Sequence, residues 1–63
     1  MPLVRIDMIA GRTQEQKEVL IKEVAEAVMR AIDAPEESIR VMIQEFPNTH
    51  WGIGREPAYK LGR

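Results

Sequence analysis

Cysteine is absent from the 63-residue sequence, and His50 is the single histidine. Disulfide bonds are therefore excluded, and so is a metal site built from several cysteine and histidine ligands. No hydrophobic run reaches the 18 residues that a membrane span needs, and the first residues lack the basic and apolar regions of a signal peptide. We therefore expect a cytoplasmic protein that does not associate with membranes.

The chain also has no large excess of charge of either sign, because nine Lys and Arg residues nearly balance ten Asp and Glu residues, for a net charge of −1. No bulk positive field attracts nucleic acid, so basic residues must be judged one at a time. The length predicts one domain, residues 1–63, and a chain of this size buries only about 60% of its unfolded surface. Without disulfides or a metal, self-association is the expected source of further burial.

The chain has the pattern of a strand, a helix and a second strand. Residues 3–9 (LVRIDMI) alternate apolar and polar side chains, as a half-buried strand does. Thr13 and Gln16 form a T-x-x-Q capping box, and apolar residues then recur at helical spacing over residues 14–33. Residues 38–46 (SIRVMIQEF) predict a second strand with apolar character on both faces.

These elements predict an α+β fold in which a right-handed βαβ crossover makes the two strands parallel. A two-stranded sheet is not stable alone, and Met42 and Phe46 fall on the face opposite the helix. We therefore expect a second subunit to cover that face. Residues 47–57 are rich in turn formers but contain Trp51 and Ile53, so they predict a short hairpin at the C-terminal end.

Pro2 is the one residue whose chemistry can be unusual. If Met1 is removed, Pro2 becomes a free secondary amine, and an α-amine has a pKa near ~7.7 to 8.0. Burial among apolar groups would lower that pKa, so the amine could act as a general base at neutral pH. The structural alternative is that Pro2 only begins an edge strand, where its missing N–H has no cost.

Two arginines can supply cations to a site. Arg12 follows the first predicted strand, and Arg40 lies on the second strand, away from its helix-facing residues, so both could reach a shared surface. Guanidinium groups bind carboxylates with bidentate geometry, which suits a small dicarboxylate. The alternative is that each arginine belongs to a surface or intersubunit ion pair. His50 fits a turn or an interface better than a catalytic role.

Four separated blocks resemble the 4-oxalocrotonate tautomerase family, whose members use an amino-terminal proline. They are Pro2, GRTQEQKEVLIKEV at residues 11–24, DAPEESIRVMIQE at residues 33–45, and HWGIGRE at residues 50–56. The resemblance implies the tautomerase/MIF-like fold, with the sheets of two protomers joined across a dimer. It also implies a homohexamer, assembled as a trimer of dimers, with active sites at subunit contacts.

The resemblance further implies a role for each of five residues. Pro2 resembles the general base that ketonises a 2-hydroxydienoate, such as 2-hydroxymuconate, to the conjugated 2-oxo acid. Arg12 resembles the residue that binds the remote carboxylate, and Arg40 the one that, from another subunit, holds the C1 carboxylate and the 2-oxygen. Trp51 stands where the family usually has a phenylalanine wall, and the backbone of Ile9 corresponds to a pocket lining. The family needs neither metal nor cofactor, and it belongs to aromatic hydrocarbon catabolism.

Two alternatives remain on the same scaffold. Some relatives are haloacrylate dehalogenases or hydratase-type lyases, in which a protonated proline donates to substrate after water attacks. The other alternative is an assembly subunit without chemistry. The sequence also departs from the family pattern at Trp51, at Arg55, where many relatives have glycine, and at Pro57.

Overall fold

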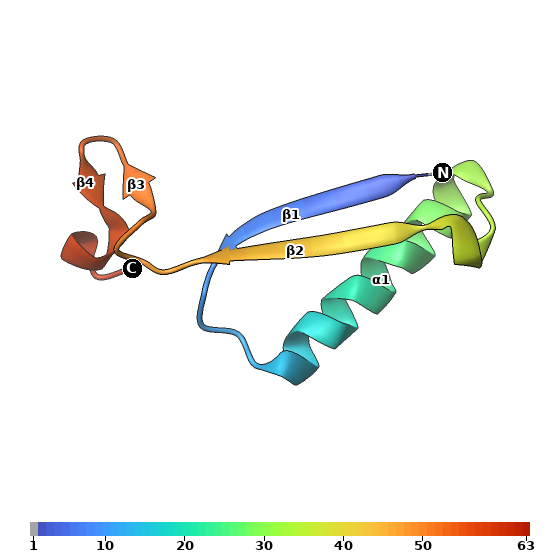
Figure 1. Cartoon of the computed structure of the whole chain (residues 1–63), viewed down its shortest axis with the longest axis horizontal. Coiled ribbons are helices and arrows are strands. Elements are labelled where there is room, and N and C mark those ends of the chain that lie inside the picture. The colour runs from blue at the N-terminus through green and yellow to red at the C-terminus, as the bar shows by residue number, and fades with distance from the viewer. Residues whose placement is uncertain (1) are drawn as a thin grey trace.

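Two parallel strands and one helix form the body of the chain (Figure 1). The computed structural model describes residues 2–63, so Met1, on whose removal the Pro2 hypothesis depends, lies outside the described residues. The elements are, in order, β1 (Leu3–Ile9), α1 (Gln14–Ile32), the 3-10 helix η1 (Glu36–Ser38), β2 (Arg40–Phe46), β3 (Gly52–Ile53), β4 (Glu56–Pro57) and the 3-10 helix η2 (Ala58–Leu61). The expected α+β class, parallel strand pair and C-terminal hairpin are confirmed.

The register of β1 against β2 assigns each residue to a face. Leu3 pairs with Arg40 at one end of the ladder and Ile9 pairs with Phe46 at the other. Along β1 and β2 exposed and half-buried residues alternate over most of each strand, as expected when a helix covers one face of a sheet. On the other face, Leu3 and Met42 remain 56% and 52% exposed, so this face of the protomer is uncovered.

Helix α1 begins at the predicted capping box. The amide N–H of Gln16 donates to Thr13 Oγ1 at 3.1 Å, and the N–H of Thr13 donates to Gln16 Oε1 at 3.0 Å. The helix ends at Asp33, which takes the left-handed conformation with φ 55°. An ion pair of 2.8 Å between Lys17 Nζ and Glu45 Oε1 then ties the first turns of α1 to the end of β2.

The second strand begins at Arg40, two residues later than the sequence pattern predicts. Ser38 belongs instead to η1, where its hydroxyl donates to the carbonyl of Pro35 at 2.8 Å. The N–H of Ile39 also donates within this turn, to the carbonyl of Glu36 at 3.1 Å. A serine side chain that bonds to nearby backbone favours a turn over a strand, which explains the shorter β2.

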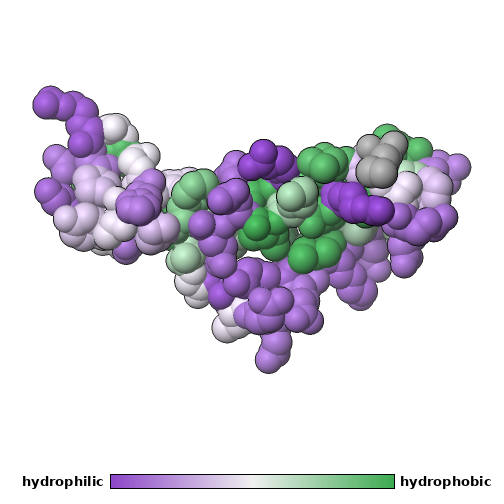
Figure 2. All heavy atoms as spheres, in the orientation of Figure 1, coloured by the Kyte–Doolittle hydropathy of each residue, from purple (hydrophilic) through white to green (hydrophobic). Residues whose placement is uncertain are grey.

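The C-terminal segment extends beyond the end of the strand ladder, away from α1, and makes the molecule elongated, with extents of 43 × 24 × 14 Å (Figure 1). Of residues 2–63, only Ala58 is fully buried. Figure 2 shows hydrophobic surface gathered over the region of the strands. Exposed apolar surface of this kind marks an interaction surface, so the protomer has the form of a subunit.

Replacing Thr13 with alanine is expected to lower the free energy of unfolding by about 1 kcal/mol, because it removes the N-cap of α1. Chemical denaturation at a fixed protomer concentration measures the change, since self-association would shift apparent stability. Thr49→Ala, in an exposed turn, is the matched control and should leave the stability unchanged. Equal effects of the two substitutions would contradict the capping role.

Candidate active site

Pro2 and Arg40 lie together at one end of the strand ladder. The N–H of Arg40 donates to the carbonyl of Pro2 at 3.1 Å, and Pro2 is half-buried. Nη1 of Arg40 donates to the carbonyls of Glu37 and Ile39 at 2.8 and 3.1 Å. These bonds orient the guanidinium while it remains exposed, and an arginine carries five N–H donors. The side chain therefore keeps further donors with which to bind an anion.

Ile9 and Trp51 lie at the opposite end of the ladder, and Arg12 follows β1 at that end. The N–H of Ala10 donates to the carbonyl of Phe46 at 2.8 Å, which closes the ladder just past Ile9. Gly11 then has φ 140°, a conformation that residues with a Cβ rarely adopt. This turn leads to Arg12, which is exposed immediately before the helix cap.

The aromatic wall candidate, Trp51, packs against Phe46. The two ring centroids are 6.1 Å apart, with an interplanar angle of 58°. The carbonyl of Trp51 accepts the N–H of Ala58 at 2.7 Å, which joins the start of the hairpin to the buried residue that follows it. The strand pattern does not predict the contact with Phe46, although the turn formers between the two aromatic residues are a signal that the chain reverses there.

One chain does not bring the two ends together. Seven residues of β1 separate Pro2 from the turn before Arg12, and Leu3 to Ile9 spans about 20 Å at ~3.3 Å per residue. Within a protomer, Arg12 and Arg40 therefore lie toward opposite ends of the ladder, and a surface shared by both arginines stays a prediction for the assembly. A small dicarboxylate is far shorter than this span, so a site with both arginines must combine residues of different chains.

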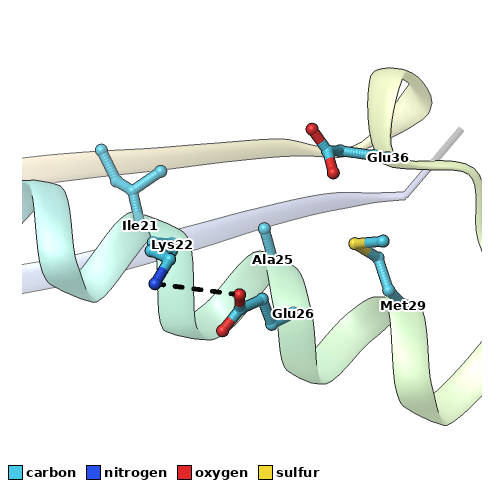
Figure 3. A pocket seen from close by; sticks show the side chains of 6 residues that line it. All are labelled: Ile21, Lys22, Ala25, Glu26, Met29 and Glu36. Atoms are coloured by element: carbon cyan, nitrogen blue, oxygen red, sulfur yellow. Dashed lines mark ion pairs between the residues drawn. The ribbon is translucent and has the colours of Figure 1, made fainter.

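A hollow of about 240 Å³ lies between α1 and η1. Figure 3 shows its lining: Ile21, Lys22, Ala25, Glu26, Met29 and Glu36. Lys22 Nζ and Glu26 Oε2 form an ion pair of 4.0 Å at its rim. None of the candidate site residues lines it.

Among residues 2–63, no group of three or more His, Asp or Glu residues is arranged to hold a metal ion. Of the helices in the same range, none has the length and apolar content needed to cross a membrane.

A sequence model of the tautomerase enzyme family matches residues 2–58, which include both strands, the helix and the hairpin. The chain belongs to the tautomerase family. Among similar proteins, a 2-hydroxymuconate tautomerase from Pseudomonas putida is 54% identical over 63 residues, with all of both chains covered. One from Stutzerimonas stutzeri is 52% identical over the same full length. Because tautomerases are isomerases, this tautomerase is an isomerase.

Solved structures agree with the fold of this tautomerase. A structure from work on the 4-oxalocrotonate tautomerase isozymes of Methylibium petroleiphilum has a TM-score of 0.93 and 47% identity, covering 98% of this chain and all of the other. A heterohexameric 4-oxalocrotonate tautomerase from Chloroflexus aurantiacus has a TM-score of 0.91 and 41% identity, covering 97% and 98% of the two chains. The described protomer is thus similar to subunits of larger assemblies.

Proposed function

We propose that this tautomerase is a 2-hydroxymuconate (4-oxalocrotonate) tautomerase-type isomerase, which ketonises a 2-hydroxydienoate to the conjugated 2-oxo acid. The observation that carries the proposal is the 54% identity, over all 63 residues, with a 2-hydroxymuconate tautomerase. Pro2, Arg12, Arg40 and Trp51 are present in the order and spacing of that family's site. The reaction is a proton transfer and requires no change in oxidation state.

Pro2 is the proposed general base. With Met1 removed, its neutral nitrogen takes the proton of the 2-hydroxyl group and returns it to the distal carbon of the diene. Electrons move from the oxygen along the conjugated chain, so the 2-oxygen becomes a carbonyl and the proton ends on carbon. A positioned base of this kind contributes about 10²- to 10⁴-fold to the rate.

The two arginines stabilise the charge that this transfer creates. Arg40 binds the C1 carboxylate and the 2-oxygen, where negative charge develops as the hydroxyl proton leaves. Arg12 binds the remote carboxylate and draws electron density toward the far end of the chain. Preorganised cations that meet developing charge stabilise the transition state more than the ground state.

Trp51 forms the proposed apolar wall, and the backbone of Ile9 lines the pocket beside it. Both are half-buried at the Arg12 end of the ladder, and exclusion of water by such a wall disfavours a charged proline. The pKa of the Pro2 amine would then fall below that of an ordinary α-amine. A larger fraction of Pro2 would therefore be neutral at physiological pH.

The proposed active form is a homohexamer, a trimer of dimers with the sheets of two protomers joined in each dimer. The span of β1, about 20 Å from Leu3 to Ile9, supports a site shared between chains, because Pro2 and Arg12 can meet across one small substrate only when they come from different chains. The exposed Leu3 and Met42 on the uncovered sheet face supply apolar surface for the contacts. The whole chain, residues 1–63, acts as one domain, and we place the enzyme in the cytoplasm, in aromatic hydrocarbon catabolism.

The pH profile of ketonisation tests this function. After intact mass spectrometry establishes that Met1 has been removed, the dienol is mixed with enzyme and its ultraviolet absorbance is followed across the titration of Pro2. For a general base, kcat/KM should rise with pH through the Pro2 pKa and level above it. The enzyme should act without added metal or cofactor.

A pH profile with a haloacrylate as substrate, measured beside the ketonisation profile, tests the alternatives. A dehalogenase or hydratase would use protonated Pro2, so its activity on a haloacrylate would fall as pH rises. An assembly subunit would accelerate neither reaction over the buffer rate. Either of these results would contradict the proposed isomerase.

A further inference from the structure

The contact between Phe46 and Trp51 joins the end of β2, which is fixed in the sheet, to the short C-terminal hairpin segment, which has fewer supporting contacts. The centroid distance of 6.1 Å and the tilt of 58° fall in the range of favourable tilted aromatic pairs, 4.5 to 7 Å. Both residues are half-buried, whereas Tyr59, the third aromatic residue of the chain, is 48% exposed. The pair is thus a specific packing contact.

Phe46 is fixed by the sheet. It pairs with Ile9 at the last position of the ladder, and its carbonyl accepts the N–H of Ala10 at 2.8 Å. The preceding residue, Glu45, forms the ion pair with Lys17 of α1. Strand, turn and helix therefore all hold the backbone from which the Phe46 ring projects.

Trp51 lies in a less supported segment. It comes just before β3, and β3 and β4 have only two residues each. A hairpin of that size has little stability of its own. The hairpin lies beyond the ladder and away from α1 (Figure 1), and within the protomer the Phe46 ring is a contact that relates the indole to the sheet.

We infer that Phe46 is a positioning residue, which holds the Trp51 indole at the angle at which it walls the substrate site. The inference rests on the proposed function for the role of Trp51 as a wall. The planar, conjugated carbon chain of a dienol fits a flat apolar surface, and an indole free to rotate would admit water beside that chain. Phe46 acts through Trp51 and touches no reacting atom.

Phe46→Leu removes the ring and keeps an apolar side chain. Loss of a tilted aromatic contact should lower kcat/KM for the dienol by about 2- to 12-fold. The change should appear mainly in KM, because the base and both arginines are untouched. Phe46→Tyr keeps the ring and should retain kinetics close to those of the unsubstituted enzyme.

Fluorescence reads the indole directly, because Trp51 is the only tryptophan. Under excitation selective for tryptophan, Phe46→Leu should show emission at longer wavelength and lower anisotropy, as expected for a more mobile and hydrated indole. Phe46→Tyr should match the unsubstituted protein. Tyr59→Leu is the matched control, since it removes an exposed aromatic side chain from the same C-terminal segment, and it should change neither emission nor KM.

Unchanged emission and unchanged KM in Phe46→Leu would overturn the inference. So would loss of assembly in both Phe46→Leu and Phe46→Met, measured by size-exclusion chromatography, because Phe46 would then be an assembly residue. The fluorescence measurement needs no turnover, so a failure of the positioning inference can be distinguished from a failure of the proposed function. An inactive unsubstituted enzyme would contradict the isomerase, while the emission of the variants would still decide whether Phe46 positions Trp51.

Discussion

Replacing Pro2 with alanine is expected to lower kcat/KM for dienol ketonisation by about 10²-fold or more, since a positioned general base contributes about 10²- to 10⁴-fold. Alanine leaves a primary amine at the chain end, but it removes the ring that fixes the nitrogen and its lone pair. The ketonisation assay, with the N-terminus of each variant established by intact mass, measures the change.

A variant that keeps the proline supplies the matched control. Insertion of one glutamate between Met1 and Pro2 converts the Pro2 nitrogen to an amide, which has almost no basicity, and leaves the side chains of residues 2–63 unaltered. This variant should lose as much activity as Pro2→Ala and should assemble normally in size-exclusion chromatography. Full activity of the inserted variant would exclude the free amine as the base.

Mixing two variants of low activity is expected to restore activity if the site is shared between chains. Arg12→Ala should by itself lower kcat/KM by about 10- to 100-fold, the range for loss of hydrogen bonds to a charged group. When Pro2→Ala and Arg12→Ala chains are unfolded together and refolded, roughly one site in four combines an intact Pro2 with an intact Arg12 by random mixing in a closed oligomer. Activity should then rise well above that of either variant.

The control for mixing is each variant refolded alone, and native mass spectrometry establishes that mixed assemblies have formed. The expectation follows from β1, which spans about 20 Å from Leu3 to Ile9 and lies between Pro2 and the turn before Arg12. Mixed assemblies with no more activity than the separate variants would show that Pro2 and Arg12 act within one chain.

Most of the secondary structure follows from local patterns. Alternation over residues 3–9 predicts β1 with the bounds observed, and the Thr13 capping box predicts the start of α1. These signals depend on residues close together in the chain, so they can be recognised from the sequence without knowledge of the fold. Ser38 is the exception, because its side chain bonds to the carbonyl of Pro35 and holds the chain in a turn where alternation predicts a strand.

The candidate site, too, was predictable from the sequence in part and depends on the fold for the rest. Residue chemistry and family resemblance select Pro2, the two arginines and Trp51. Neither shows that Arg40 lies beside Pro2 while Arg12 lies at the other end of β1. That arrangement depends on the pairing of β1 with β2, which joins residues distant in the chain.

The sequence by itself determined the elements and the chemical groups, because hydrophobic period, capping and side-chain chemistry are local properties. Only the tertiary structure decided which groups share an end of the sheet and that Phe46 packs on Trp51. Those outcomes depend on contacts between residues distant in the chain.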